Sequence, residues 1–127
     1  MPINALSIVT ESPLNVGEDH LPFVLELLMR ANKKLTLGSL EYDLDRLQLM
    51  FRITNLFERE KYDPTIVSSM VQTAVAELDR ITPYVGVILQ TADDLLDELS
   101  IERLLMREDL LPPVPSQEEN DEYHSDI

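Results

Sequence analysis

The sequence lacks cysteine and tryptophan, and it contains only three glycines in 127 residues. Without cysteine there is no disulfide bond, no thiolate nucleophile and no thiolate metal ligand. Positive charge is also scarce, because ten Lys and Arg residues accompany 24 Asp and Glu residues, for a net charge of −14. Nucleic acids and anionic membranes are bound through basic patches, so this charge argues against both kinds of partner.

Long apolar runs are missing as well. No stretch approaches the roughly 18 consecutive apolar residues of a membrane-spanning helix, and residues 1–15 have neither the charged region nor the apolar core of a signal peptide. We therefore expect a cytoplasmic protein. The length suits a single α+β domain over residues 1–111. Residues 112–127 begin with prolines and continue with five acids and no Lys or Arg, which predicts a disordered acidic tail.

The centre of the chain, residues 34–55, predicts an antiparallel β-hairpin. In its second arm the apolar residues alternate with polar ones, and the expected inward positions are Leu47, Leu49, Phe51 and Ile53. In its first arm, residues 35–42, the apolar phase changes at Gly38, which predicts a β-bulge. Asp43, Leu44 and Asp45 form the expected turn. Because a lone hairpin is marginally stable in water, helices must cover its apolar face.

The N-terminal half supplies a further strand and a helix. Residues 5–10 are rich in β-branched and apolar types, and they form either an edge strand on the hairpin or an arm that binds a partner subunit. A helix is expected to begin near Glu18 or Asp19 and to end near Lys33, with Pro22 in its first turn.

The C-terminal half predicts three more helices. The first begins at Asp63-Pro64, an N-cap followed by proline, and Thr82-Pro83 ends or kinks it. A third helix is expected over residues 83–99, and Ser100 caps a short last one. The fold class is therefore α+β: a hairpin or small three-stranded antiparallel sheet, flanked by amphipathic helices, with extra C-terminal helices.

Three phrases in this order resemble the YbjN family, whose fold is similar to that of the type III secretion chaperones. After Asn32 come the phrases LTLGSLEYD and RLQLMFRIT, and then AVAELDRITP, which contains Asp79-Arg80 and Pro83. The resemblance covers about residues 8–88. It implies an α+β fold, homodimerisation and protein–protein interaction, with no catalytic residue to carry over. The sequence departs from the family in its additional C-terminal helices and acidic tail.

Four carboxylates on the expected third helix form pairs at i and i+4: Asp93 with Asp97, and Asp94 with Glu98. Such pairs can hold a hard divalent cation, but the solvent-exposed side of an amphipathic helix accounts for them better. Asp43 and Asp45 lack the further oxygen ligands of a calcium loop, so turn formation explains them.

The remaining candidates for chemistry are few. His20 and His124 have no neighbouring sequence pattern of a catalytic triad, and the scattered glycines form no phosphate-binding loop. We therefore expect no enzymatic activity, no cofactor and no metal site.

Interaction surfaces are the better-supported candidates. Met50 is expected on the outer face of the hairpin, with Tyr42 beside it and Arg52 nearby, where they would suit a partner or a dimer mate. In the tail, Glu118, Glu119 and Tyr123 would contact a basic partner. The sequence thus predicts a small homodimeric interaction protein, chaperone-like or adaptor-like, whose other partner is a protein. The alternative is an acidic inhibitor or nucleic-acid mimic that acts through residues 93–127.

Overall fold

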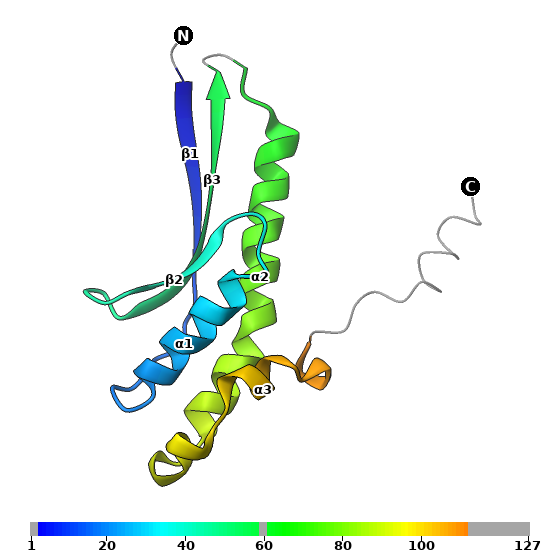
Figure 1. Ribbon diagram of the computed structural model, residues 1–127. Coiled ribbons are helices and arrows are strands. Elements are labelled where there is room, and N and C mark those ends of the chain that lie inside the picture. The colour runs from blue at the N-terminus through cyan, green and yellow to red at the C-terminus, as the bar shows by residue number, and fades with distance from the viewer. Residues whose placement is uncertain (1–2, 59–60, 112–127) are drawn as a thin grey trace, which may run out of the picture.

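The computed structural model describes residues 3–58 and 61–111, which form an α+β fold with a three-stranded antiparallel sheet (Figure 1). The predicted fold class is confirmed. The elements are strand β1 (Ile3–Glu11), helix α1 (Leu21–Asn32), strands β2 (Ser39–Asp43) and β3 (Gln48–Glu58), helix α2 (Pro64–Gln90), 3-10 helix η1 (Asp93–Glu98), helix α3 (Ile101–Leu105) and 3-10 helix η2 (Glu108–Leu110). Among the described residues, no helix is both long and apolar enough to span a membrane.

The strand order is β1-β3-β2, so β3 lies in the centre and both of its neighbours run antiparallel to it. β1 pairs with β3 along its whole length, from Ile3 opposite Glu58 to Glu11 opposite Met50. Of the two alternatives for residues 5–10, the structure therefore shows the edge strand. β2 is shorter and pairs with the first half of β3, with Leu40 opposite Phe51.

The alternation expected in β3 is confirmed for its inner face. Leu49, Phe51 and Ile53 are buried, and Phe57 continues the same face because the strand extends to Glu58. Leu47 is the exception: it lies in the turn with a φ of 54° and a 60% exposed side chain. The strand therefore extends to Glu58, three residues beyond the predicted end of the hairpin at residue 55.

The first arm of the hairpin is shorter than predicted. β2 begins only at Ser39, and residues 35–38 form a bend rather than a strand with a bulge. Gly38 has a φ of 71°, and a Cβ atom there would lie 2.6 Å from the ring of Phe51 and 2.7 Å from the carbonyl oxygen of Arg52. Because glycine has no Cβ, the chain can approach β3 closely just before β2 begins.

The turn between β2 and β3 has the chemistry expected of it. The Asp43 carboxylate accepts hydrogen bonds from the backbone N–H groups of Asp45 and Arg46, at 3.0 and 3.1 Å. This arrangement is an Asx-turn, in which an aspartate side chain replaces a backbone acceptor.

Helix α2 begins as predicted and ends later than predicted. The Asp63 side chain caps it by accepting a hydrogen bond from the Thr65 N–H at 2.9 Å. The helix then continues through Pro83 to Gln90, so the prediction of a separate third helix from residue 83 is wrong. An internal proline costs roughly 3 kcal/mol. Burial of Tyr84, Val85 and Ile88 after it offsets that cost, since each such side chain contributes about 1.5–3 kcal/mol.

The other helix boundaries follow local signals. α1 begins at Leu21, two or three residues after the expected start at Glu18 or Asp19, with proline in its first turn. The expected acidic helical turn exists as η1, and the Ser100 hydroxyl caps α3 by accepting from the Arg103 N–H at 3.3 Å. One buried cluster joins side chains of α1, β2, β3, α2, η1 and α3, and α2 packs against the inner face of β1 and β3.

Candidate interaction surfaces

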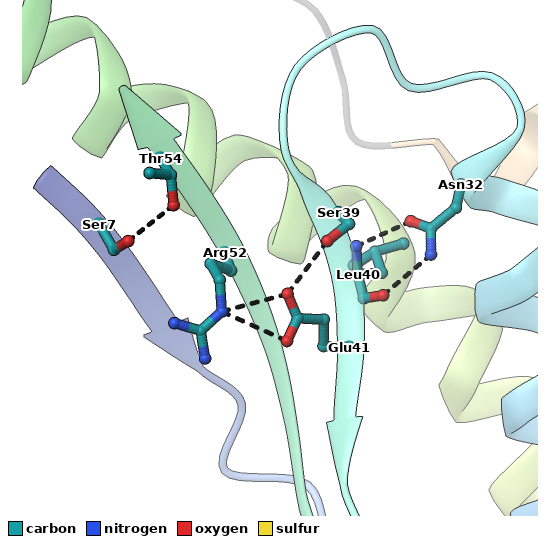
Figure 2. A network of polar contacts seen from close by, with 7 residues as sticks. All are labelled: Ser7, Asn32, Ser39, Leu40, Glu41, Arg52 and Thr54. Atoms are coloured by element: carbon teal, nitrogen blue, oxygen red, sulfur yellow. Dashed lines mark hydrogen bonds and ion pairs between the residues drawn. The ribbon is translucent and has the colours of Figure 1, made fainter. Parts of the chain in front are cut away.

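On the outer face of the sheet, which α2 does not cover, polar side chains of all three strands form a network of contacts (Figure 2). Arg52 on β3 forms an ion pair with Glu41 on β2, at 3.2 Å, and Glu41 also accepts a hydrogen bond from the Ser39 hydroxyl. On the other side of β3, the hydroxyl groups of Ser7 and Thr54 are 2.6 Å apart. Cross-strand polar pairs of this kind stabilise the sheet modestly.

Met50 shares this outer face, as predicted from its parity, but it is only 4% exposed. It lies between Glu11 on β1 and Glu41 on β2. Both carboxylates are held by arginines, Glu11 by Arg46 at 2.9 Å and Glu41 by Arg52. The expectation that Met50 offers an exposed apolar anchor is therefore wrong, because neighbouring ion-paired side chains surround it.

Tyr42 does not lie beside Met50. It pairs with Leu49, whose side chain points into the core, and it packs against the core cluster as a partly buried residue. Its hydroxyl group is buried and has no hydrogen-bond partner among the described residues. Tyr42 therefore belongs to the inner face, and of the three predicted sheet residues only Arg52 is exposed on the outer one.

The β2 edge of the sheet is closed by a side chain of α1. Asn32, the last residue of α1, accepts a hydrogen bond from the Leu40 N–H at 2.8 Å and donates one to the Leu40 carbonyl at 2.9 Å (Figure 2). These two backbone groups point away from β3. The asparagine amide thus occupies the place that another strand would take, and it prevents further pairing along this part of the edge.

The β1 edge has no such cover among the described residues. β1 lies at the outside of the sheet in Figure 1, and the backbone hydrogen bonds of residues 3–11 are those of its ladder with β3. A nine-residue edge strand is long for an unprotected one. The sequence predicts a strand here as one of two alternatives, but local patterns do not show which sheet edge stays open.

A groove of about 440 Å³ lies between α1, α2 and the C-terminal segment. Its apolar lining comes from Ala31, Leu35, Leu40, Ile81, Tyr84, Leu105, Met106 and Leu111, and its charged lining from Lys34, Glu77, Arg80, Arg107 and Glu108. Two apolar residues at its border are solvent-exposed, Met106 to 71% and Leu111 to 43%. The sequence pattern does not predict this groove, because its walls come from α1, β2, α2, α3 and η2, which only the tertiary structure brings together.

A polar cluster fixes the C-terminal wall of this groove. The Tyr84 hydroxyl donates to the Arg107 carbonyl oxygen at 2.6 Å, which ties α2 to the segment after α3. Burial raises the pKa of Tyr84, and the nearby Asp109 carboxylate raises it further. The Arg107 guanidinium donates two hydrogen bonds to the Asp109 carboxylate, at 3.2 and 2.7 Å. This bidentate contact lowers the pKa of Asp109.

The acidic residues of η1 do not assemble a metal site. Asp93, Asp94, Asp97 and Glu98 are all exposed, and no three metal-ligating side chains gather within residues 3–58 and 61–111. The Nε2–H of His20 donates a hydrogen bond to the Thr91 carbonyl oxygen at 3.0 Å, and Nε2 lies 3.8 Å from the Asp93 carboxylate. These contacts link the start of α1 to the end of α2, which is a structural role.

The predicted tail residues Glu118, Glu119 and Tyr123 lie outside the described residues, as does His124. Comparison with protein-family models, with curated proteins and with solved structures finds no match for this chain. The resemblance to the YbjN family therefore stays a prediction from the sequence.

Proposed function

We propose that this protein is a non-catalytic protein–protein interaction module of the cytoplasm, chaperone-like or adaptor-like, that works as a homodimer without a cofactor. The groove between α1, α2 and the C-terminal segment carries the proposal. Its volume and largely apolar lining are those of a site that accepts a few side chains of a partner rather than a whole domain.

The composition of the groove defines the chemistry of the partner. Leu40, Ile81 and Tyr84 are each at most 5% exposed and form an apolar floor. At the border, Met106 supplies a flexible thioether side chain that adapts to differently shaped apolar groups. Lys34 at the border favours an acidic flank, whereas Arg80 is already paired with Glu77 at 4.0 Å. The proposed ligand is thus a short segment with two or three apolar side chains next to an Asp or Glu.

The resemblance to the YbjN family and the type III secretion chaperones supports this proposal independently of the groove. That resemblance implies protein binding and homodimers, and it assigns no catalytic residue. The predicted order of helix, strand pair and helix around Asn32 and Asp63 is the order in the structure.

A matched pair of variants tests the groove. Met106 and Met29 are both surface methionines, exposed to 71% and 73%, but only Met106 lines the groove. Peptides selected from a random displayed library against the wild-type protein should be enriched in the pattern of apolar residues beside an acid. We expect Met106→Glu to weaken their binding by at least about tenfold, because it places a carboxylate among apolar anchors and next to an acidic ligand.

Met29→Glu adds the same charge and removes the same side chain elsewhere, so it should bind the selected peptides like the wild type. Equal binding by both variants would remove the groove as the site. Failure to select any peptide with the expected pattern would count against the proposed ligand chemistry.

One observation favours a second function. The four carboxylates of η1 are exposed together, and this favours an acidic inhibitor or nucleic-acid mimic that acts through residues 93–127. Such binding to a basic partner should weaken steeply with added salt. Binding in the groove depends mainly on apolar contact and should change little between low and physiological salt.

A further inference from the structure

The direction of the backbone groups along β1 follows from one hydrogen bond. Ser12 is one residue beyond the pair of Glu11 and Met50, and its N–H donates to the Leu49 carbonyl at 2.8 Å. In an antiparallel ladder, successive residues alternate between pointing both backbone groups at the partner strand and pointing both away. The residues that point away from β3 are therefore Ile3, Ala5, Ser7, Val9 and Glu11.

The other edge of the sheet confirms this parity. By the same alternation, Leu40 on β2 should point its N–H and C=O away from β3, and these are the two groups that Asn32 binds. One edge is therefore closed by a dedicated side chain. The five residues of β1 that face outward keep their backbone donors and acceptors available.

The composition of β1 offers no protection against pairing. Sheet edges are usually protected by charged side chains, prolines, bulges or shortness. From Ile3 to Thr10 the strand contains no charged residue, no proline and no glycine. Its one charge, Glu11, is at the end of the strand and is already paired with Arg46.

We propose that β1 is the seam of a homodimer, in which a second copy of this chain pairs antiparallel with it and Ser7 lies on the two-fold axis. The two sheets then join into one continuous six-stranded sheet. This inference rests on the homodimer of the proposed function and supplies its interface, but it does not depend on binding in the groove.

The strand is complementary to itself in this register. With Ser7 opposite Ser7, Ala5 lies opposite Val9 of the second copy on the outer face, and Leu6 lies opposite Ile8 on the inner face. Ile3 lies opposite Glu11, so all five outward-pointing residues of each strand find a partner. Small apolar residues directly opposite each other stabilise an antiparallel pair, and a two-fold axis makes the interface use the same patch on both copies.

Helix α2 adds apolar surface on the same side. Ile66, Ser69 and Thr73 line a hollow with Leu37 and Gly38, so this flank of α2 faces the start of β2. At 100° per residue, Val71 and Val75 lie on the opposite flank, which is the flank toward β1. They are 43% and 44% exposed. A two-fold axis beside β1 would make these valines face those of the second copy.

The charge of the chain fits a neutral seam. Two copies that each carry a net charge of −14 repel one another, and an interface free of charge from Ile3 to Thr10 keeps the carboxylates away from the contact. Added salt screens the remaining repulsion. The dimer should therefore become tighter as salt increases, which is opposite to the behaviour of binding driven by charge attraction.

The test is the mass of the full-length chain in solution, measured by analytical ultracentrifugation over a range of concentrations. The wild type should approach twice the chain mass of 14.5 kDa. Ser7→Pro removes the N–H at the two-fold axis, on the side where β3 does not need it, so the monomer should fold. We expect the dissociation constant to rise at least about tenfold, since two backbone hydrogen bonds are lost together.

Thr54→Ala is the control for Ser7→Pro, because it removes the same hydroxyl contact without touching the edge, and it should stay dimeric. The second test variant is Ala5→Glu with Val9→Glu, which puts like charges opposite each other in the dimer. Its control is Met29→Glu with Leu95→Glu, which adds the same charge at exposed residues of α1 and η1.

A wild-type mass of 14.5 kDa at every concentration would overturn the dimer. Dimers that persist in both edge variants would overturn the seam and leave the dimer itself in place. Binding of the selected peptides by the monomeric Ser7→Pro variant would show that the groove works without the seam, so the two proposals fail or stand separately.

Discussion

Replacing Asn32 with alanine should expose how much the closed edge of the sheet contributes to stability. The Asn32 amide makes two hydrogen bonds, and both go to the backbone of Leu40. Leu40 is 5% exposed, so water cannot readily replace the amide. The substitution would leave one N–H and one carbonyl of a buried strand without partners.

The magnitude follows from these two bonds. A net contribution of about 0.5–1.5 kcal/mol per hydrogen bond, plus a penalty of about 1–3 kcal/mol for a buried polar group left unpaired, sets the scale. Alanine is the better helix former and returns a few tenths of a kcal/mol at the end of α1. We therefore expect Asn32→Ala to lower the free energy of unfolding by about 2–5 kcal/mol.

Urea denaturation at one fixed protein concentration measures this change, since self-association raises the apparent stability. Amide hydrogen exchange at Leu40 provides a local measure, because the N–H should lose protection while those of α2 keep theirs. The matched control is Asn15→Ala, at an exposed loop residue, which should stay within about 0.5 kcal/mol of the wild type. If Asn32→Ala costs no more than Asn15→Ala, the amide does not hold this edge and the reasoning is refuted.

Two further predictions concern single groups. Gly38→Ala should lower the free energy of unfolding, measured by urea denaturation, by about 2–4 kcal/mol, because a Cβ at a φ of 71° would meet the Phe51 ring. Gly86→Ala is the control, since a Cβ there enters open space on α2, and it should raise the free energy of unfolding by about 0.5–1 kcal/mol. Equal changes in the two variants would contradict this prediction. Because the pKa of Tyr84 is raised on folding, its contribution is fully present below pH 10 and is lost as the pH rises through the folded-state pKa. Thermal melts from pH 8 to pH 12 should therefore show a steeper alkaline loss for the wild type than for Tyr84→Phe, and identical slopes would contradict the assignment.

Local patterns in the sequence were sufficient to predict the parts of the fold that depend on neighbours along the chain. The alternation of Leu49, Phe51 and Ile53 places them on one face of a strand in any tertiary context. The Asp63 cap and the Ser100 cap each need only a side chain and the next turn of helix. The α+β class follows from these elements.

Predictions that depended on distant residues were less accurate. Parity placed Met50 on the outer face, but its burial depends on ion pairs whose partners lie on all three strands and on the turn between β2 and β3. The sequence predicts Tyr42 beside Met50, but in the pairing register of β2 with β3 Tyr42 lies opposite Leu49 and therefore on the inner face. Pro83 predicted that the helix ends or kinks there, with a separate helix after it, but the helix continues because packing of the following turns against the core outweighs the cost of the proline.

The sequence by itself determined the local elements, the excess of negative charge and the absence of thiol chemistry. Only the tertiary structure decided which sheet edge is closed and which is open, because that depends on α1 bringing Asn32 to Leu40 and on β1 crossing to the far side of β3. It also decided where a partner can bind, since the groove is formed by elements far apart in the chain. Secondary structure arises from short-range periodicity, whereas edges and grooves arise from the order in which the elements pack.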